Sequence, residues 1–332
     1  MAVEARQPQR KLYISTVPHA AALRYRGRPR TEARHGISYF QAIFIGVLQG
    51  ITELFPVSSL GHSVLVPALF GWDQVVKQQS ASESAFLAFL VGLHVATAIA
   101  LIIYFRRDWA RIIKAFFHTL STRHAETPDE RLAWLLIIGT IPVGITGLLL
   151  EHALRVLFAK PLAASIFLIL NGLILFAGER LRRRSEVRAL AVEHGGEGRD
   201  PERRLETLEY REAGVVGLFQ TFALLAGISR SGITIVAGLL RGLSHEDAAR
   251  FSFLLATPVI LAAGVYKLPD LFGPLGNGIR GQVVVGSLAA GLSAYVSVRF
   301  LMRWFETRTL RPFAIYSVSV GVLATLYFGV IR

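Results

Sequence analysis

The chain contains two related stretches: residues 49–64 read QGITELFPVSSLGHSV, and residues 220–235 read QTFALLAGISRSGITI. They align at a constant offset, since 220 − 49 = 171, and this offset pairs Ser58 with Ser229. Each copy is an apolar segment that Pro or Gly interrupts near its middle, followed by small hydroxyl residues. Paired, interrupted apolar segments in the two halves of a membrane protein indicate a binding site near the bilayer midplane.

The composition around these stretches is that of a membrane protein. Of the 332 residues, 52% are hydrophobic and only 18% are charged, which is too apolar for an ordinary soluble domain of this length. The net charge is +13, and beyond the basic tail 1–36 most arginines lie in short segments between apolar runs, as at the cytoplasmic flanks of membrane helices. We therefore expect no nucleic-acid partner. The absence of Cys excludes disulfides, thiolate metal sites and Cys nucleophiles.

Several apolar runs are long enough to cross a bilayer by the criterion of about 20 residues. They occupy residues 85–105, 132–151, 161–179, 248–267, 282–302 and 312–331. The two related stretches lie in further apolar segments, 38–70 and 212–241, which hold helix breakers and polar residues at their centres. Broken backbone at membrane depth needs protein or water partners, so we expect each segment to form a re-entrant hairpin. Two short full spans, or one long span, are the alternatives for each segment.

This pattern predicts an all-α polytopic membrane protein built as an inverted-topology repeat. Each half, residues 37–179 and 212–332, is expected to hold a re-entrant helical hairpin followed by three transmembrane helices. Because three crossings separate the hairpins, they should enter from opposite faces, and their tips should meet near the midplane. Residues 180–211, which carry many charges and a glycine-rich run, are expected to form a solvated linker.

The distribution of Lys and Arg predicts the orientation of the chain. The connections 106–131, 180–211 and 303–311 hold six, nine and three of these residues, whereas the opposite side holds only Arg155, Lys160 and Arg280. The richer side should be cytoplasmic, so the first hairpin opens outward and the second opens to the cytoplasm. The basic tail 1–36 would then lie outside. We expect this tail to be disordered. A tail that is not native, or an odd number of crossings in the first hairpin, would resolve that conflict.

Three ionisable residues fall inside the interrupted segments: Glu53, His62 and Arg230. A charge at membrane depth costs about 2.5–3.5 kcal/mol on insertion scales, which makes each a candidate functional residue. Arg230 offers a fork of donors suited to phosphate, and the glycines around it open a helix N-terminus that favours anions. The following small residues lie at the same depth and could line a phosphate site: Ser58, Ser59, Ser229, Ser231, Gly232 and Thr234. Helix capping alone is the alternative explanation for the hydroxyls.

Glu53 and His62 have several chemical roles open to them. A carboxylate repels phosphate, so Glu53 is expected to hold a divalent cation that bridges to phosphate, or to act as a base. His62 lies three residues after Ser59 and is expected to activate that hydroxyl or to protonate a leaving phosphate. A satisfied buried polar group is the alternative for His62. His94 and Asn171, in the first and third spans, are expected to make interhelical hydrogen bonds.

The two motifs resemble the signatures of the bacterial undecaprenyl-diphosphatase (UppP/BacA) family, over about residues 37–331. They are Gln49-x-x-x-Glu53 with Pro56-Val57-Ser58-Ser59-x-Gly61-His62, and Gly227-x-Ser229-Arg230-Ser231-Gly232-x-Thr234. The resemblance implies removal of the terminal phosphate of undecaprenyl diphosphate at the outer side of the bacterial cytoplasmic membrane. That reaction recycles the lipid carrier of cell-wall synthesis and confers bacitracin resistance. A requirement for Mg²⁺ or Ca²⁺ is also implied. The family often has Glu where this chain has Gln49, so a metal would depend more on Glu53, phosphate and water.

We therefore predict an integral membrane phosphatase. In this hypothesis Ser59, or a water that it positions, attacks the terminal phosphorus, while Arg230 and Ser229 stabilise charge on the phosphate oxygens. His62 handles the proton, and Glu53 holds the metal with help from Gln49. A polyprenyl-phosphate transporter with the same site is the alternative, since inverted repeats are mainly a transporter device. The oligomeric state stays open, with a homodimer among the options.

Overall fold

The computed structural model describes residues 37–72, 75, 85–158, 160–192, 204–273 and 277–331. Within these residues the chain is helical and contains no strand, which confirms the all-α prediction. The basic tail 1–36 and residues 193–203 of the expected linker lie outside the described residues.

The long helices match the predicted spans. Within the described residues, six helices are long and apolar enough to cross a membrane. They are α4 (Ala85–Tyr104), α6 (Pro128–Phe158), α7 (Pro161–Val192), α10 (His245–Phe272), α11 (Arg280–Phe305) and α12 (Arg311–Leu326), which continues as a helical turn so that its span is Arg311–Ile331. Two details differ from expectation. The connection 106–131 contains an amphipathic helix, α5 (Arg106–Thr122), and α7 continues 13 residues beyond the expected boundary at 179, since 192 − 179 = 13.

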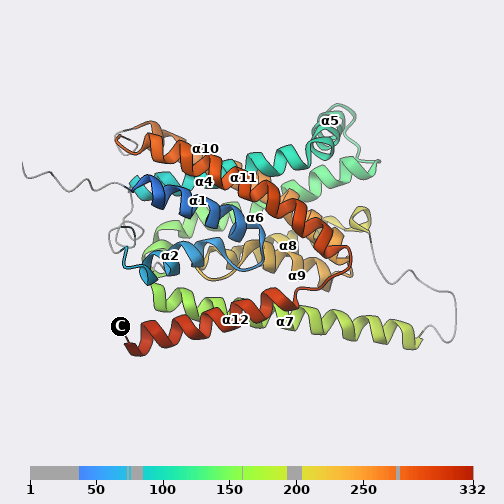
Figure 1. Cartoon of the computed structure of the whole chain (residues 1–332). Helices are drawn as coiled ribbons and strands as arrows, with labels where there is room; N and C mark the ends of the chain where they lie inside the picture. The colour runs from blue at the N-terminus through green and yellow to red at the C-terminus, as the bar shows by residue number, and fades with distance from the viewer. Residues whose placement is uncertain are drawn as a thin grey trace, which may run out of the picture. The chain divides into compact units, whose positions relative to one another are not determined.

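The two related segments each form a pair of short helices. The first pair is α1 (Tyr39–Leu54) and α2 (Ser59–Leu69), and the second is α8 (Tyr210–Thr221) and α9 (Arg230–Leu240). At 16 residues the longest of them, α1, extends about 24 Å, which is short of a hydrocarbon core of about 30 Å. In Figure 1 the α1–α2 pair enters from the end of the bundle where α12 finishes, and the α8–α9 pair enters from the opposite end. This arrangement is compatible with the predicted inverted repeat.

Local chemistry explains why both segments break. α1 ends at Leu54, and Phe55 is extended (ψ 140°) because the residue before a proline, here Pro56, is disfavoured in the helical region. In the second segment the break contains Gly227, whose φ of +112° is rarely open to a residue with a side chain.

A serine restarts each helix after the break. The Oγ of Ser58 accepts a hydrogen bond from the Gly61 amide at 3.1 Å, and the Oγ of Ser229 accepts one from the Gly232 amide at 3.1 Å. These are N-cap bonds, so helix capping, the alternative raised for the hydroxyls, accounts for part of what these two serines do.

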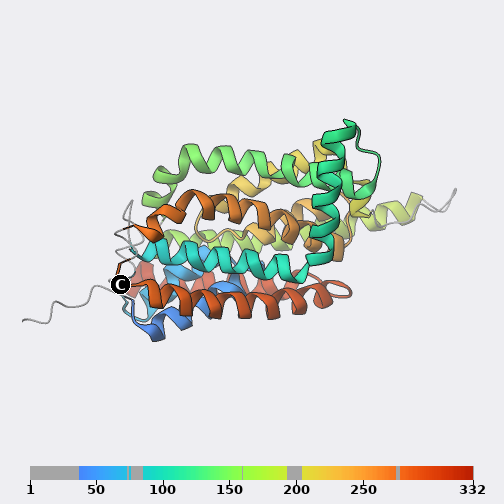
Figure 2. The same ribbon diagram turned by 90° about the horizontal axis from the view of Figure 1, so that it is seen from above.

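Packing brings the two halves of the chain together. The first helix of each hairpin packs on a long helix of the other half: α1 on α11, and α8 on α6. α7 and α12 also pack on each other, and Figure 2 shows the long helices running side by side. At the tips the backbones touch, because a Cβ added to Gly61 would lie only 2.9 Å from the Cα of Gly227. The tips of the two interrupted segments therefore meet inside the helix bundle.

Candidate active site

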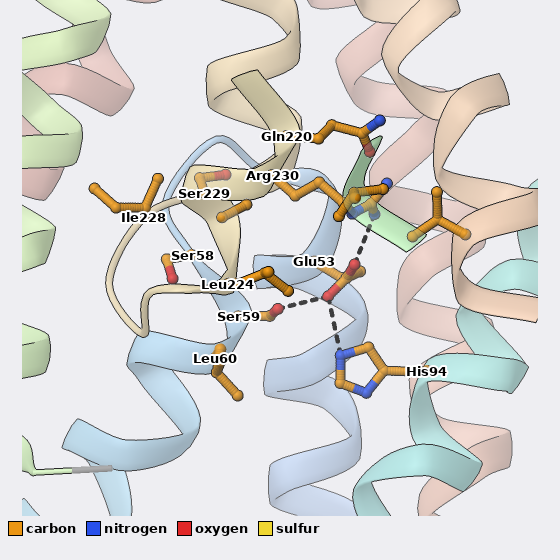
Figure 3. A pocket seen from close by; sticks show the side chains of 13 residues that line it. Glu53, Ser58, Ser59, Leu60, His94, Gln220, Leu224, Ile228, Ser229 and Arg230 are labelled. Atoms are coloured by element: carbon orange, nitrogen blue, oxygen red, sulfur yellow. Dashed lines mark hydrogen bonds and ion pairs between the residues drawn. The ribbon is translucent and has the colours of Figure 1, made fainter. Parts of the chain in front are cut away.

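A cavity of about 160 Å³ lies where the two hairpin tips meet, and Figure 3 shows it from close by. Polar lining side chains come from both hairpins, and His94 on α4 adds to them. Val143 on α6 and Val259 on α10 supply apolar lining. The cavity thus combines charged groups with a wall of membrane helices.

Glu53, at the end of α1, is the centre of the polar network in the cavity. Its side chain is only 6% exposed. Its Oε1 accepts a hydrogen bond from Arg230 Nη2 at 2.7 Å, and its Oε2 accepts one from Ser59 Oγ at 2.5 Å. Gln49 Nε2 also donates to Oε2, at 3.0 Å. The structure therefore brings together four residues that the sequence singled out, from three different helices.

His94 is a member of this network that the sequence did not assign to the site. Its Nε2 lies 3.4 Å from Glu53 Oε2, and its Nδ1 lies 2.8 Å from the carbonyl oxygen of Leu90. Both ring nitrogens face acceptors, so the arrangement suits a ring that carries a proton on each nitrogen. The expected interhelical hydrogen bond is present, but its partner is the candidate catalytic carboxylate.

Ser58 and Asn171 link the two hairpin tips through hydrogen bonds. The amide of Gly227 donates to Ser58 Oγ at 3.2 Å. From α7, Asn171 donates to the carbonyl oxygen of Pro56 at 3.0 Å and accepts from the Ser229 amide at 2.9 Å. Ser58 has a φ of +72°, an uncommon value for a residue with a side chain, which these contacts hold in place. The tips are thus fixed relative to each other before any ligand binds.

The predicted phosphate-binding residues divide into two groups. Ser58, Ser59 and Ser229 line the cavity. Ser231 and Thr234 are buried beside it: Ser231 Oγ donates to the Phe55 carbonyl at 3.2 Å, and Thr234 Oγ1 lies 2.5 Å from Ser252 Oγ. The amide of Gly232 donates to Ser229 Oγ in the N-cap of α9, as described above. In this structure Ser231 links the second hairpin to the first and Thr234 links it to α10, and none of these three residues lines the cavity.

The structure does not bring His62 to Ser59. The His62 ring is buried, with Nδ1 2.7 Å from the Ser58 carbonyl oxygen and Nε2 2.8 Å from the hydroxyl of Tyr316 on α12. It does not line the cavity, and the side chain within hydrogen-bonding distance of Ser59 Oγ is Glu53. The three-residue spacing along α2 fits either arrangement, and the partner on α12, more than 250 residues away, decides between them.

The residues of the cavity show what kind of metal binding the site can support. Among the described residues, no group of three or more His, Asp or Glu is placed to hold an ion. Glu53 is the one carboxylate among the lining residues, and both its oxygens already accept hydrogen bonds. Gln49 presents its nitrogen to Glu53. Such a site fits a cation that arrives with phosphate oxygens as ligands, as Mg²⁺ often does, and not a cation held by protein groups alone.

The fold and the site together define a class: a multi-pass membrane protein with a site that contains arginine and serine between two interrupted hairpins. The N-termini of α2 and α9 flank this site, where helix N–H groups and dipoles favour an anion. The chain belongs to the family described as bacitracin resistance protein BacA, whose family model matches residues 42–323.

Curated relatives cover most of the chain. It is 58% identical over 341 residues to a protein of Frankia alni named undecaprenyl-diphosphatase 2, covering 89% of this chain and 99% of that protein. It is 59% identical over 294 residues to the undecaprenyl-diphosphatase of Mycolicibacterium paratuberculosis, covering 86% and 95%. A more distant relative from Chromobacterium violaceum, named undecaprenyl-diphosphatase 2, is 44% identical over 292 residues.

Proposed function

We propose that this protein is an undecaprenyl-diphosphate phosphatase, which converts undecaprenyl diphosphate and water into undecaprenyl phosphate and inorganic phosphate. The observation that carries the proposal is the contact of 2.5 Å between Ser59 Oγ and Glu53 Oε2, beside Arg230 in a cavity formed by both hairpins. The family and the names of the relatives support the same activity. They give no support to the transporter alternative.

The first chemical step uses Ser59 as the nucleophile. Ser59 Oγ attacks the terminal phosphorus, its proton passes to Glu53, and the bond from that phosphorus to the bridging oxygen breaks. Undecaprenyl phosphate leaves and takes the proton from Glu53, so the phosphoryl group stays on Ser59. In this scheme Glu53 has the proton-handling role that the sequence had assigned to His62, because Glu53 is the group that contacts the hydroxyl.

The pairing of Arg230 with Glu53 links substrate binding to this step. Without substrate the guanidinium neutralises the carboxylate across 2.7 Å. A diphosphate in the cavity competes for the same guanidinium, which is well suited to phosphate oxygens. Glu53 is then available to accept the proton of Ser59. Arg230, Ser229 and the N–H groups at the start of α9 stabilise the charge on the transferring phosphoryl group.

A divalent cation, Mg²⁺ or Ca²⁺, is part of the proposal. It would arrive with the diphosphate, with Glu53 as its protein carboxylate and Gln49 beside it. When bound, it would neutralise charge on the phosphate oxygens.

The protein is a multi-pass membrane protein by its six long apolar helices and its family. We further propose that it lies in the bacterial cytoplasmic membrane with the α1–α2 hairpin open to the periplasmic side. The distribution of Lys and Arg supports this orientation. The connections 106–131, 180–211 and 303–311 are rich in these residues, which marks their side as cytoplasmic. The polyprenyl tail would remain among the helices. Hydrolysis at this face removes the lipid diphosphate that bacitracin sequesters, which explains resistance.

Phosphate release by the intact chain tests the function. Purified protein in lipid vesicles receives undecaprenyl diphosphate with Mg²⁺, with Ca²⁺ or with EDTA. We expect metal-dependent release, and a loss of about 10³-fold in Glu53→Gln, because that change removes the base. Right-side-out membrane vesicles given external substrate should release phosphate without detergent. Absence of release from the folded wild-type protein, or near-normal turnover by Glu53→Gln, would refute the proposal.

A further inference from the structure

Gln220, near the end of α8, carries a buried polar atom with no partner at the wall of the cavity. The side chain is 0% exposed, and its Nε2 donates to the carbonyl oxygen of Gly139 on α6 at 3.0 Å. Its Oε1 has no hydrogen-bond partner. In the described part of the chain, the indole nitrogen of Trp109 is the only other buried side-chain atom in this condition. Such an atom is costly to the fold unless something in the cavity binds it.

The internal repeat explains why the side-chain oxygen of Gln220 has no hydrogen-bond partner. Gln220 occupies the position of Gln49 in the first copy, at the offset of 171. Gln49 donates to Glu53, four residues further along α1, whereas the residue four positions after Gln220 is Leu224. Without that carboxylate, the amide nitrogen of Gln220 reaches the Gly139 carbonyl. This bond fixes the orientation of the amide, because its nitrogen must face the acceptor.

The oxygen of Gln220 therefore faces the cavity, near Arg230. Gln220 lines the cavity, and Figure 3 shows its oxygen turned toward the guanidinium end of Arg230, with its nitrogen turned away. Arg230 itself is bonded to Glu53 in this structure. Any ligand held by Arg230 would come next to the free oxygen.

The chemistry of a carbonyl oxygen limits its partner. It only accepts hydrogen bonds, so its partner must donate one, and a fully ionised phosphate oxygen cannot. Water can, and a polar cavity of about 160 Å³ has room for it. The proposed reaction also consumes one water per turnover, after the lipid product has left.

We propose that Gln220 is a positioning residue whose Oε1 holds the water that hydrolyses phosphorylated Ser59; this inference rests on the proposed function. The water oxygen attacks the phosphorus and the bond from Ser59 Oγ to phosphorus breaks. One water proton passes to Glu53 and on to Ser59 Oγ, and inorganic phosphate leaves. Gln220 takes no proton in this step: it aligns the water by accepting its second O–H.

The test is a rapid-quench experiment on the full chain with undecaprenyl diphosphate labelled on its terminal phosphate. Gln220→Leu removes the acceptor at nearly constant volume. We expect a first-turnover burst of undecaprenyl phosphate near the wild-type rate, followed by a steady-state rate lower by about 10- to 100-fold. Label should accumulate on the protein, and it should be absent from Ser59→Ala. The kcat/KM should change by less than about 3-fold, and KM should fall together with kcat, because the substrate contacts and the first step are unchanged.

Two further variants separate the acceptor from the structural bond to Gly139. Gln220→Glu keeps an acceptor oxygen and loses the amide N–H. It should recover hydrolysis of the phosphoenzyme to within about 10-fold of wild type, with a higher KM because its charge repels the diphosphate. Thr221→Val, on the next residue outside the cavity, should behave as wild type.

The outcomes distinguish this inference from the proposed function. Wild-type steady-state turnover by Gln220→Leu, or an equal fall in its burst and steady-state rates, would overturn the water-positioning role. Near-normal turnover by Ser59→Ala, without label on any variant, would instead overturn Ser59 as nucleophile. In that case the turnover of Gln220→Leu still decides whether Gln220 positions a water that attacks the diphosphate directly.

Discussion

Glu53 is the residue on which both halves of the chain converge. Its carboxylate accepts hydrogen bonds from the hydroxyl of Ser59 on α2, the guanidinium of Arg230 on α9 and the side-chain amide of Gln49 on α1. The imidazole of His94 on α4 also contacts it. A carboxylate buried at this depth is tolerable only when such partners satisfy it. The same partners set its chemistry, because one oxygen contacts the candidate nucleophile and the other contacts the group expected to bind phosphate.

His94 provides the prediction at the residue scale. His94→Ala removes a charge-assisted contact to Glu53 Oε2, so the carboxylate is held less firmly against Ser59. Such contacts are worth about 1.5–3 kcal/mol, and we expect kcat to fall by about 10- to 100-fold. The control is His124→Ala, at an exposed position after α5. Phosphate release measures both variants, and an unchanged kcat in His94→Ala would remove this residue from the site.

The sequence predicted some of these residues and missed others for a physical reason. Glu53, Ser59 and Arg230 lie in repeated motifs at positions where apolar helices are interrupted, so their depth and proximity follow from the repeat. His94 lies in an uninterrupted span, where one polar residue is compatible with many helix contacts. The position of His62 depended on its distant partner Tyr316, and no local pattern predicts that contact.

At the scale of elements, the hairpins keep their place through close helix contacts. Gly46 and Gly50 form one side of α1, and they pack against α11 at Gly286 and Ala290. A Cβ at Gly50 would collide with the backbone oxygen of Ala290. Small residues four apart allow membrane helices to approach closely, which is how such helices associate without a hydrophobic driving force between them.

Gly50→Val is the matching prediction. We expect it to separate α1 from α11 and to destabilise the protein by about 1–3 kcal/mol, as overpacking does. Because α1 carries Glu53, activity should fall with it. Gly147→Ala on α6 is the control, since an added Cβ there meets nothing within 4 Å. Thermal unfolding in detergent measures both. A Gly50→Val protein as stable as Gly147→Ala would contradict the packing described for α1.

At the scale of the whole molecule, two interrupted hairpins enter the bundle from opposite ends and meet at one cavity (Figures 1 and 3). Their order along the chain, the odd number of spans between them and the offset of 171 residues made this arrangement predictable. The helices that pack on each hairpin were not predictable in this way. Contacts such as α1 with α11 join residues more than 200 positions apart, and apolar helix faces carry little information about their partners.

The central claim is that Glu53 and Arg230, from different hairpins, act as one unit. The measurement that tests it most directly is kcat/KM for phosphate release by wild type, Glu53→Gln, Arg230→Ala and the double variant. If the two tips form one catalytic centre, the double variant should lose about as much as the worse single variant, because residues that act together are strongly non-additive. Losses that multiply would mean that the two side chains act independently, and that result would contradict the account.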